Sequence, residues 1–106
     1  MRLDRIERQE AVTVDIIDCA AKPELNNTSM TCCTLDVSEV GMQILAEMPL
    51  PVATRLGLRL DLQTALYRLE AEVRWQLSET DHRAGVLLDD DSPDFVPWTQ
   101  MFHLDF

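Results

Sequence analysis

Three residues near the middle of the chain, Asp36, Ser38 and Gly41, have types and a spacing that suit a polar binding site. They form the pattern Asp-x-Ser-x-x-Gly between two apolar segments. Asp36 offers a carboxylate acceptor, Ser38 offers a hydroxyl, and Gly41 offers a backbone that a ligand can approach closely. We expect a sharp turn between two strands, serving either as a plain hairpin corner or as a ligand-recognition site.

No catalytic arrangement accompanies this pattern. His82 and His103 are isolated, and the sequence has no Walker loop, HExxH, GxSxG or zinc-like spacing. A nucleophile, a base and an oxyanion donor cannot be assembled from the remaining residues. We therefore expect a binding protein rather than an enzyme, with no catalytic residues, no metal ligands and no cofactor.

The charge of the chain limits the class of ligand. Nine Lys and Arg residues stand against nineteen Asp and Glu residues, which gives a formal net charge of −10. This charge opposes binding to nucleic-acid polymers, because their affinity comes largely from phosphate neutralisation. A barrel for single-stranded nucleic acid would also need a basic groove and exposed aromatic residues. A small anion stays compatible with the charge, because two or three well-placed cations suffice to bind it.

The cysteines and the first residues of the chain bear on the cellular compartment of the protein. The three cysteines are odd in number and lack CxxC spacing, so we expect no disulfide framework. The first residues include Asp4 and Glu7 without an apolar run, and no segment approaches the length of a membrane-spanning helix. We expect a cytoplasmic protein without membrane insertion.

Alternating apolar and polar residues predict a single domain with six strands. The longest strand places Val73, Trp75 and Leu77 on one parity, which predicts a core position for Trp75, and its length favours bending around a barrel. Gly85 in the last strand marks a place where another backbone or a bulky ring approaches closely. The predicted strands cover residues 11–18, 29–35, 41–47, 56–62, 67–77 and 84–88.

The two ends of the chain differ from this middle part. Residues 1–9 form a polar arm that contains Arg2, Arg5 and Arg8, and we interpret it either as a frayed terminus or as an arginine clamp for an anion. At the other end, Ser92 and the following proline and acid predict a helix over residues 92–106. Pro97 offers an alternative start for the helix proper, with a short turn before it. The prediction is an all-β fold, with a six-stranded antiparallel β-barrel over residues 10–91 and a short C-terminal α-helix.

Taken together, these features resemble a PilZ domain over nearly the whole chain. The resemblance implies a six-stranded antiparallel β-barrel followed by a helix, and cyclic di-GMP, a bacterial second messenger, as the ligand. It is carried by Asp36, Ser38, Gly41, Val73, Trp75, Gly85 and Val86. The ligand-binding residues that it implies here are Arg5, Arg8, Asp36, Ser38, Gly41 and Trp75.

The chain departs from the family in its arm, where the family has an RxxxR motif. Four residues before Arg8 stands Asp4, and four residues before Arg5 stands Met1. The arginines present are three apart, and residues three apart in an extended segment face opposite sides. The grip of two arginines on one face is therefore not reproduced unless the arm turns.

Two functions follow from this combination. The first is a cyclic di-GMP receptor whose arm becomes ordered on binding, which changes the surface offered to an unidentified protein partner. The second is a degenerate PilZ-like domain that does not bind the nucleotide and acts as a protein–protein interaction module. The intact Asp-x-Ser-x-x-Gly pattern favours the first function, and the altered arginine motif favours the second. In either case we expect Ala at position 36 or 38 to cost little stability, because we place both residues in a turn.

Overall fold

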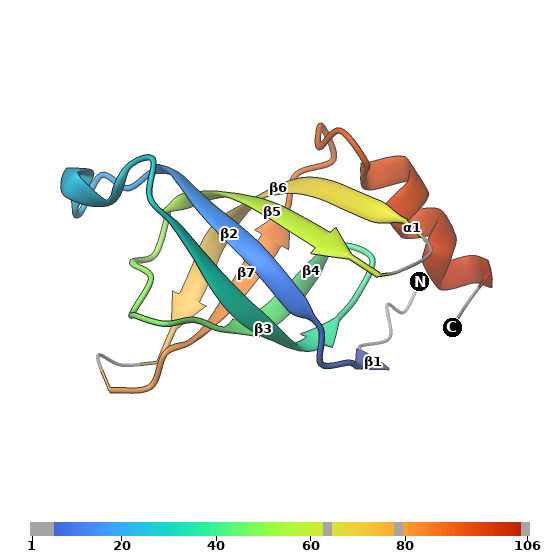
Figure 1. Ribbon diagram of the computed structural model, residues 1–106, viewed down its shortest axis with the longest axis horizontal. Helices are drawn as coiled ribbons and strands as arrows, with labels where there is room; N and C mark the ends of the chain where they lie inside the picture. Colours follow the sequence, from blue (N-terminus) through green and yellow to red (C-terminus); the bar gives the residue numbers. More distant parts are fainter. Residues whose placement is uncertain (1–5, 63–64, 78–79, 105–106) are drawn as a thin grey trace.

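Six antiparallel strands close into a barrel in a computed structural model of the chain, which describes residues 6–62, 65–77 and 80–104 (Figure 1). The order around the barrel is β3-β2-β5-β6-β7-β4, and the pairing of β3 with β4 closes the ring. The predicted fold class is confirmed. The six strands are β2 (Ala11–Asp18), β3 (Ser29–Val37), β4 (Gly41–Leu45), β5 (Arg55–Asp61), β6 (Leu66–Gln76) and β7 (Arg83–Leu88).

The barrel forms because the apolar side chains of each strand recur at every second position. On β2 the side chains of Val12, Val14 and Ile16 are buried, while those between them are at least partly exposed. The same alternation holds along β5 and along β6 as far as Val73. One face of each strand therefore fills the barrel, and the hydrophobic effect at about 25 cal/mol per Å² of buried apolar area stabilises the closed form.

A seventh, very short strand extends the sheet at the N-terminal side. This strand, β1 (Ile6–Glu7), pairs antiparallel with the last two residues of β3. The backbone N–H of Arg8 then donates to the Leu35 carbonyl at 3.3 Å. Residues 6–8 of the arm that we expected over residues 1–9 therefore lie along β3. Arg5 and the rest of the predicted arm lie outside the described residues.

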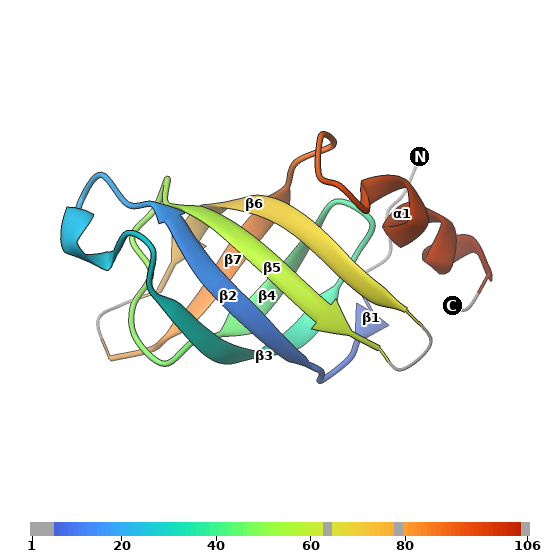
Figure 2. The ribbon, with the colours of Figure 1, turned by 45° about the horizontal axis from the view of Figure 1, so that its top comes forward.

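The C-terminal helix, α1 (Phe95–Leu104), lies at one end of the barrel beside the start of β6 (Figure 2). Trp98 anchors it, since its ring is buried and packs edge-on against Tyr67 at 5.6 Å and Phe102 at 5.2 Å between ring centroids. The helix begins three residues later than predicted, because residues 92–94 form a turn. Within the described ranges no helix is long and apolar enough to cross a membrane.

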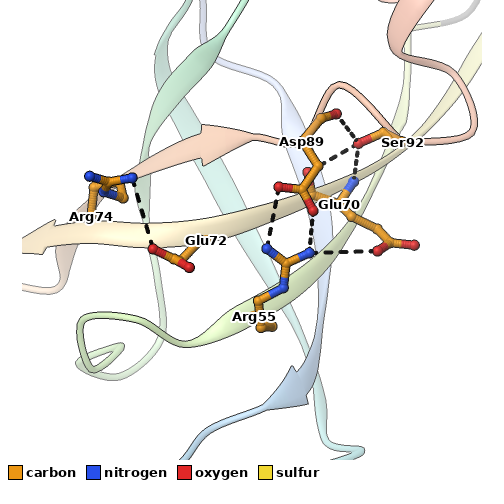
Figure 3. Close-up of polar contacts among 6 residues, drawn as sticks. All are labelled: Arg55, Glu70, Glu72, Arg74, Asp89 and Ser92. Carbon is orange, nitrogen blue, oxygen red and sulfur yellow. Dashed lines mark hydrogen bonds and ion pairs between the residues drawn. The ribbon is translucent and has the colours of Figure 1, made fainter.

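A polar cluster fastens the loop after β7 to the neighbouring strands (Figure 3). The Arg55 guanidinium donates to both carboxylate oxygens of Asp89, and this hydrogen bonding raises the pKa of Arg55. The Ser92 hydroxyl accepts from the Glu70 backbone N–H at 2.8 Å and donates to the Asp89 carbonyl at 2.7 Å. Ser92 thus ties the loop to β6 and does not cap the helix as we expected. No group of three metal-ligating side chains occurs among the residues that the structure describes.

Candidate ligand-binding site

The turn of the Asp-x-Ser-x-x-Gly pattern is closed by Ser38 itself. The Ser38 hydroxyl lies 3.1 Å from both the N–H and the carbonyl oxygen of Gly41, accepting from the first and donating to the second. The Ser38 backbone N–H also donates to the Gly41 carbonyl at 2.8 Å. Only 4% of Ser38 is exposed. The hydroxyl therefore stabilises the turn, and its predicted contact with a ligand stays a prediction.

Gly41 is required by strand packing. A Cβ at this position would lie 2.6 Å from the carbonyl oxygen of Val86 in β7, which is closer than real Cβ atoms come. Its backbone does not have a positive φ, so the conformation itself does not demand glycine. The geometry explains Gly41 by the close approach of two strands, whereas the predicted approach of a ligand is untested.

Asp36 lies before the turn, at the end of β3, and belongs to a row of outward-facing residues. The strand register pairs Asp36 with Glu7 on one side and with Gln43 on the other. Gln43 in turn pairs with Gly85, and Gly85 pairs with Trp75. We call these five residues the outer row; it crosses β1, β3, β4, β7 and β6.

A hollow of about 470 Å³ lies over the first part of the outer row. Its polar lining consists of two carboxylates and two carboxamides, so it is rich in hydrogen-bond acceptors and also offers amide donors. Such a lining suits a ligand edge with several N–H groups better than it suits a bare phosphate. The residues around the hollow are Glu7, Gln9, Leu35, Asp36 and Gln43.

Gln43, Glu7 and Gln9 were not predicted as site residues. A signal for Gln43 was present, because it has the opposite parity from the buried Met42 and Ile44. Because side chains alternate along a strand, the residue between two buried ones must face outward, on the same face as Asp36 in the register. For Glu7 and Gln9 the sequence gives no comparable signal, since two residues are too few to show alternation.

Trp75 lies on the outer surface, so the core position predicted from its parity is wrong. The register shifts between Val73 and Trp75, which shows that β6 has one extra residue there. The parity of the strand changes at this bulge, and Trp75 is 37% exposed. A hollow of about 200 Å³ lies beside it, and its lining brings Trp75 together with Ser38 and Gly41, two other predicted site residues; Arg74 and Leu87 also line it.

The indole of Trp75 lies directly against Gly85. A Cβ at Gly85 would lie 2.1 Å from the indole Nε1 and 2.3 Å from Cε2. The prediction that a bulky ring crowds Gly85 is confirmed. Because the ring is held against a backbone and is still partly exposed, it offers a surface on which a planar group can stack. Its role in ligand binding stays a prediction.

Arg8, the one predicted clamp residue within the described ranges, is held by Glu10. The Arg8 Nε donates to the Glu10 carboxylate at 2.9 Å. The exposed fraction is 29% for the Arg8 side chain and 32% for the Glu10 side chain. Four residues after Arg8 stands Val12, which is fully buried in the barrel. The structure therefore places no second arginine on the C-terminal side of Arg8 at the family spacing.

The other arginines are also engaged. Each of the six arginines at positions 6–62, 65–77 and 80–104 has a carboxylate within 4.0 Å. An anionic ligand that used any of these cations would therefore compete with a carboxylate of the chain. The pairs besides that of Arg8 are Arg55–Asp89, Arg59–Asp15, Arg68–Asp94, Arg74–Glu72 and Arg83–Asp81.

The turn also anchors the C-terminal helix, which the sequence did not predict. The indole N–H of Trp98 donates to the Ser38 carbonyl at 3.1 Å, and this contact is buried. At the surface, His103 Nε2 lies 3.1 Å from the Glu39 carboxylate. The turn is thus connected both to the outer row through β3 and to α1 through Ser38 and Glu39.

The comparisons with known proteins agree with this geometry. A scan against protein families matches the PilZ domain over residues 7–95. The fold is similar to the PilZ domain of CeSA from a cellulose synthesizing bacterium, with a TM-score of 0.68, 18% identity and 93% of each chain covered. It is also similar to the PilZ domain with c-di-GMP of YcgR from Escherichia coli, with a TM-score of 0.65, 16% identity, and 96% of this chain and 87% of that chain covered. A search of curated proteins gave no match.

Proposed function

The chain belongs to the PilZ domain family, and on this premise we propose that it is a cyclic di-GMP receptor that passes nucleotide binding on to a protein partner. The observation that carries the proposal is the hollow of about 470 Å³ at which Asp36 and Gln43 meet beside β1. The PilZ domain of YcgR, which shares the fold, has been solved with c-di-GMP. The ligand is therefore a known partner of this barrel type.

The outer row suits the bases of this ligand. A guanine edge presents N–H donors next to a carbonyl acceptor, and a carboxylate such as that of Asp36 can accept two donors at once. The Gln43 carboxamide, which both donates and accepts, lies opposite Asp36 in the register. Trp75 at the other end of the row offers a stacking face. In this arrangement Asp36 selects guanine, and Trp75 adds affinity without base selectivity.

The phosphates need cations, and the proposal assigns these to the N-terminal segment. Arg8 follows β1 directly in the chain, and Arg5 precedes it. Arg8 does not line the hollow, because it alternates in the chain with Glu7 and Gln9, which do. Ligand binding would require the Arg8 side chain to leave the Glu10 carboxylate and turn toward a phosphate. Because the arginines do not have the family spacing, we expect weaker binding than a complete clamp would give. The loss of one charge-assisted hydrogen bond costs about 1.5–3 kcal/mol, or roughly tenfold to a hundredfold in affinity.

Calorimetric titration with cyclic di-GMP tests the proposal. We expect binding to the wild-type chain and at least roughly tenfold weaker binding to Asp36→Asn, which keeps the shape but removes the charged acceptor. Asp18→Asn is the matched control, because Asp18 is an exposed acid at the far end of β2. Equal affinities for the wild type and Asp36→Asn would contradict the role of Asp36.

Two observations favour a second function. Arg8 is paired with Glu10, and the position four residues later, where the family motif has an arginine, is the buried Val12. In this alternative the domain has lost the nucleotide and serves as a protein–protein interaction module. It predicts no heat and no chemical-shift change when cyclic di-GMP is added at tens of micromolar. The same titration thus separates the two functions.

A further inference from the structure

The segment between β1 and β2 is fastened to a single buried side chain, that of Thr34. Thr34 is fully buried, and its hydroxyl donates to the Arg8 carbonyl at 2.5 Å and accepts from the Glu10 N–H at 2.9 Å. The Thr34 backbone N–H also donates to the Glu10 carbonyl at 2.9 Å. One threonine therefore satisfies the backbone groups at the break between the two strands.

This fastening determines how the side chains of the segment point. Arg8 and Glu10 are two residues apart, and in an extended segment such residues face the same side. With both backbones held by Thr34, the guanidinium and the carboxylate meet at 2.9 Å. Only about a third of each side chain is exposed, so the pair is shielded more than an ordinary surface pair.

We propose that Glu10 is a built-in competitor of anionic ligands for Arg8, and that Thr34 is the positioning residue that keeps the two side chains together. A phosphate and the Glu10 carboxylate use the same donors of the guanidinium, so a ligand phosphate gains Arg8 only when Glu10 releases it. This inference rests on the proposed function, because it names the group that limits the affinity of that site for cyclic di-GMP. Glu10 thus sets the nucleotide concentration at which the domain responds.

The proposal predicts a variant that binds better than the wild type. Glu10→Gln removes the competing charge, and a partly exposed ion pair of this kind corresponds to a gain of roughly 1.5- to fivefold in affinity. We expect this gain in calorimetric titrations with cyclic di-GMP at low salt, and we expect it to shrink in high salt. Glu24→Gln is the control for the change in net charge, since Glu24 is exposed in the 3-10 helix (Pro23–Leu25), and its affinity should equal that of the wild type.

Two further variants separate competition from a general structural effect. In an Arg8→Ala background, Glu10→Gln should give no gain, because the cation for which Glu10 competes is absent. Thr34→Ser, which keeps the hydroxyl, should retain the effect of Glu10→Gln. Thr34→Val should abolish that effect and speed hydrogen exchange of the Glu10 amide. If Thr34→Val does not fold, Thr34→Ser and the Arg8→Ala cycle still decide the question.

The outcomes distinguish this inference from the proposed function. Binding by the wild type with no tighter binding by Glu10→Gln, or with an equal gain in the Arg8→Ala background, overturns the role of Glu10 only. Binding by Glu10→Gln alone supports that role in its strongest form. The absence of heat from the wild type and from every variant overturns the receptor function itself, and the competition with it.

Discussion

The turn at residues 38–41 and the outer row contain residues of one short motif, yet they do different things. Ser38 and Gly41 face inward or against β7, and their polar atoms and free space are used by the chain itself. Asp36, two residues earlier, lies beside a hollow of about 470 Å³. Ser38 and Gly41 also line the smaller hollow beside Trp75, so the motif combines one outward carboxylate at the larger hollow with two residues that build the turn between the two hollows.

The residues of this motif therefore belong to two different parts of the molecule. The indole N–H of Trp98 in α1 donates to the Ser38 carbonyl. A change in the shape of the turn would therefore also disturb the helix. In the outer row, Glu7, Asp36, Gln43 and Trp75 are at least partly exposed, whereas Gly85 is buried beneath the Trp75 indole. Substitutions in the turn should therefore lower the free energy of unfolding, whereas substitutions of Asp36 should mainly lower the affinity for the ligand.

Gly41→Ala should produce the largest loss of stability. Its Cβ would lie 2.6 Å from a backbone oxygen of β7, and backbone cannot move aside as a flexible side chain can. We expect the free energy of unfolding, measured by urea denaturation, to fall by about 2–3 kcal/mol, as for other overpacked sites.

Gly57→Ala is the matched control for Gly41→Ala. A Cβ at Gly57 would meet the side chains of Ile17 and Asp15 at ordinary distances, 3.6 Å for the nearest Ile17 atom and 3.8 Å for the Asp15 Cβ. Since Ala is favoured over Gly within a strand, stability should be unchanged or rise by about 0.5 kcal/mol. Equal destabilisation by both alanines would mean that close packing of β4 on β7 is not the reason for Gly41.

Ser38→Ala should have the next largest effect on stability. It leaves the Gly41 N–H without its hydroxyl partner in a buried turn, which costs about 1–2 kcal/mol. Asp36→Asn should stay within about 0.5 kcal/mol of the wild type, because Asp36 is partly exposed and its shape is kept. The buried hydrogen bonds of Ser38 argue against the expectation from the sequence that Ala at position 38 costs little stability. A Ser38→Ala chain of full stability that has lost nucleotide binding would instead assign the hydroxyl to the ligand.

Much of the fold could be predicted, because the barrel depends on a regularity that the sequence carries. Inward side chains recur at every second position, and the bounds of β2 agree with those predicted from this alternation. The prediction that Ser92 caps α1 was wrong. Its hydroxyl instead forms hydrogen bonds with the backbone of Asp89 and Glu70.

The candidate site was harder to predict, because it lies where the regularity fails. β3 has an extra residue between Thr34 and Asp36, and β6 has one between Val73 and Trp75. A bulge changes which parity faces outward, and counting along a strand cannot reveal it. The motif predicts Asp36 as a site residue, but the outer row exists only because the two bulges and the register bring its members together.

Gly85→Ala tests the far end of the outer row and should cost less stability than Gly41→Ala or Ser38→Ala. The added methyl group meets the Trp75 indole, a side chain that can turn away, so we expect a loss of about 1 kcal/mol or less. The indole N–H signal of Trp75 in NMR spectra should shift, whereas that of Trp98, which is buried and bonded to Ser38, should stay in place. Because the stacking face has moved, the affinity for cyclic di-GMP should fall by severalfold. A shifted Trp75 signal with unchanged affinity would remove Trp75 from the ligand site and confine binding to the hollow beside Asp36.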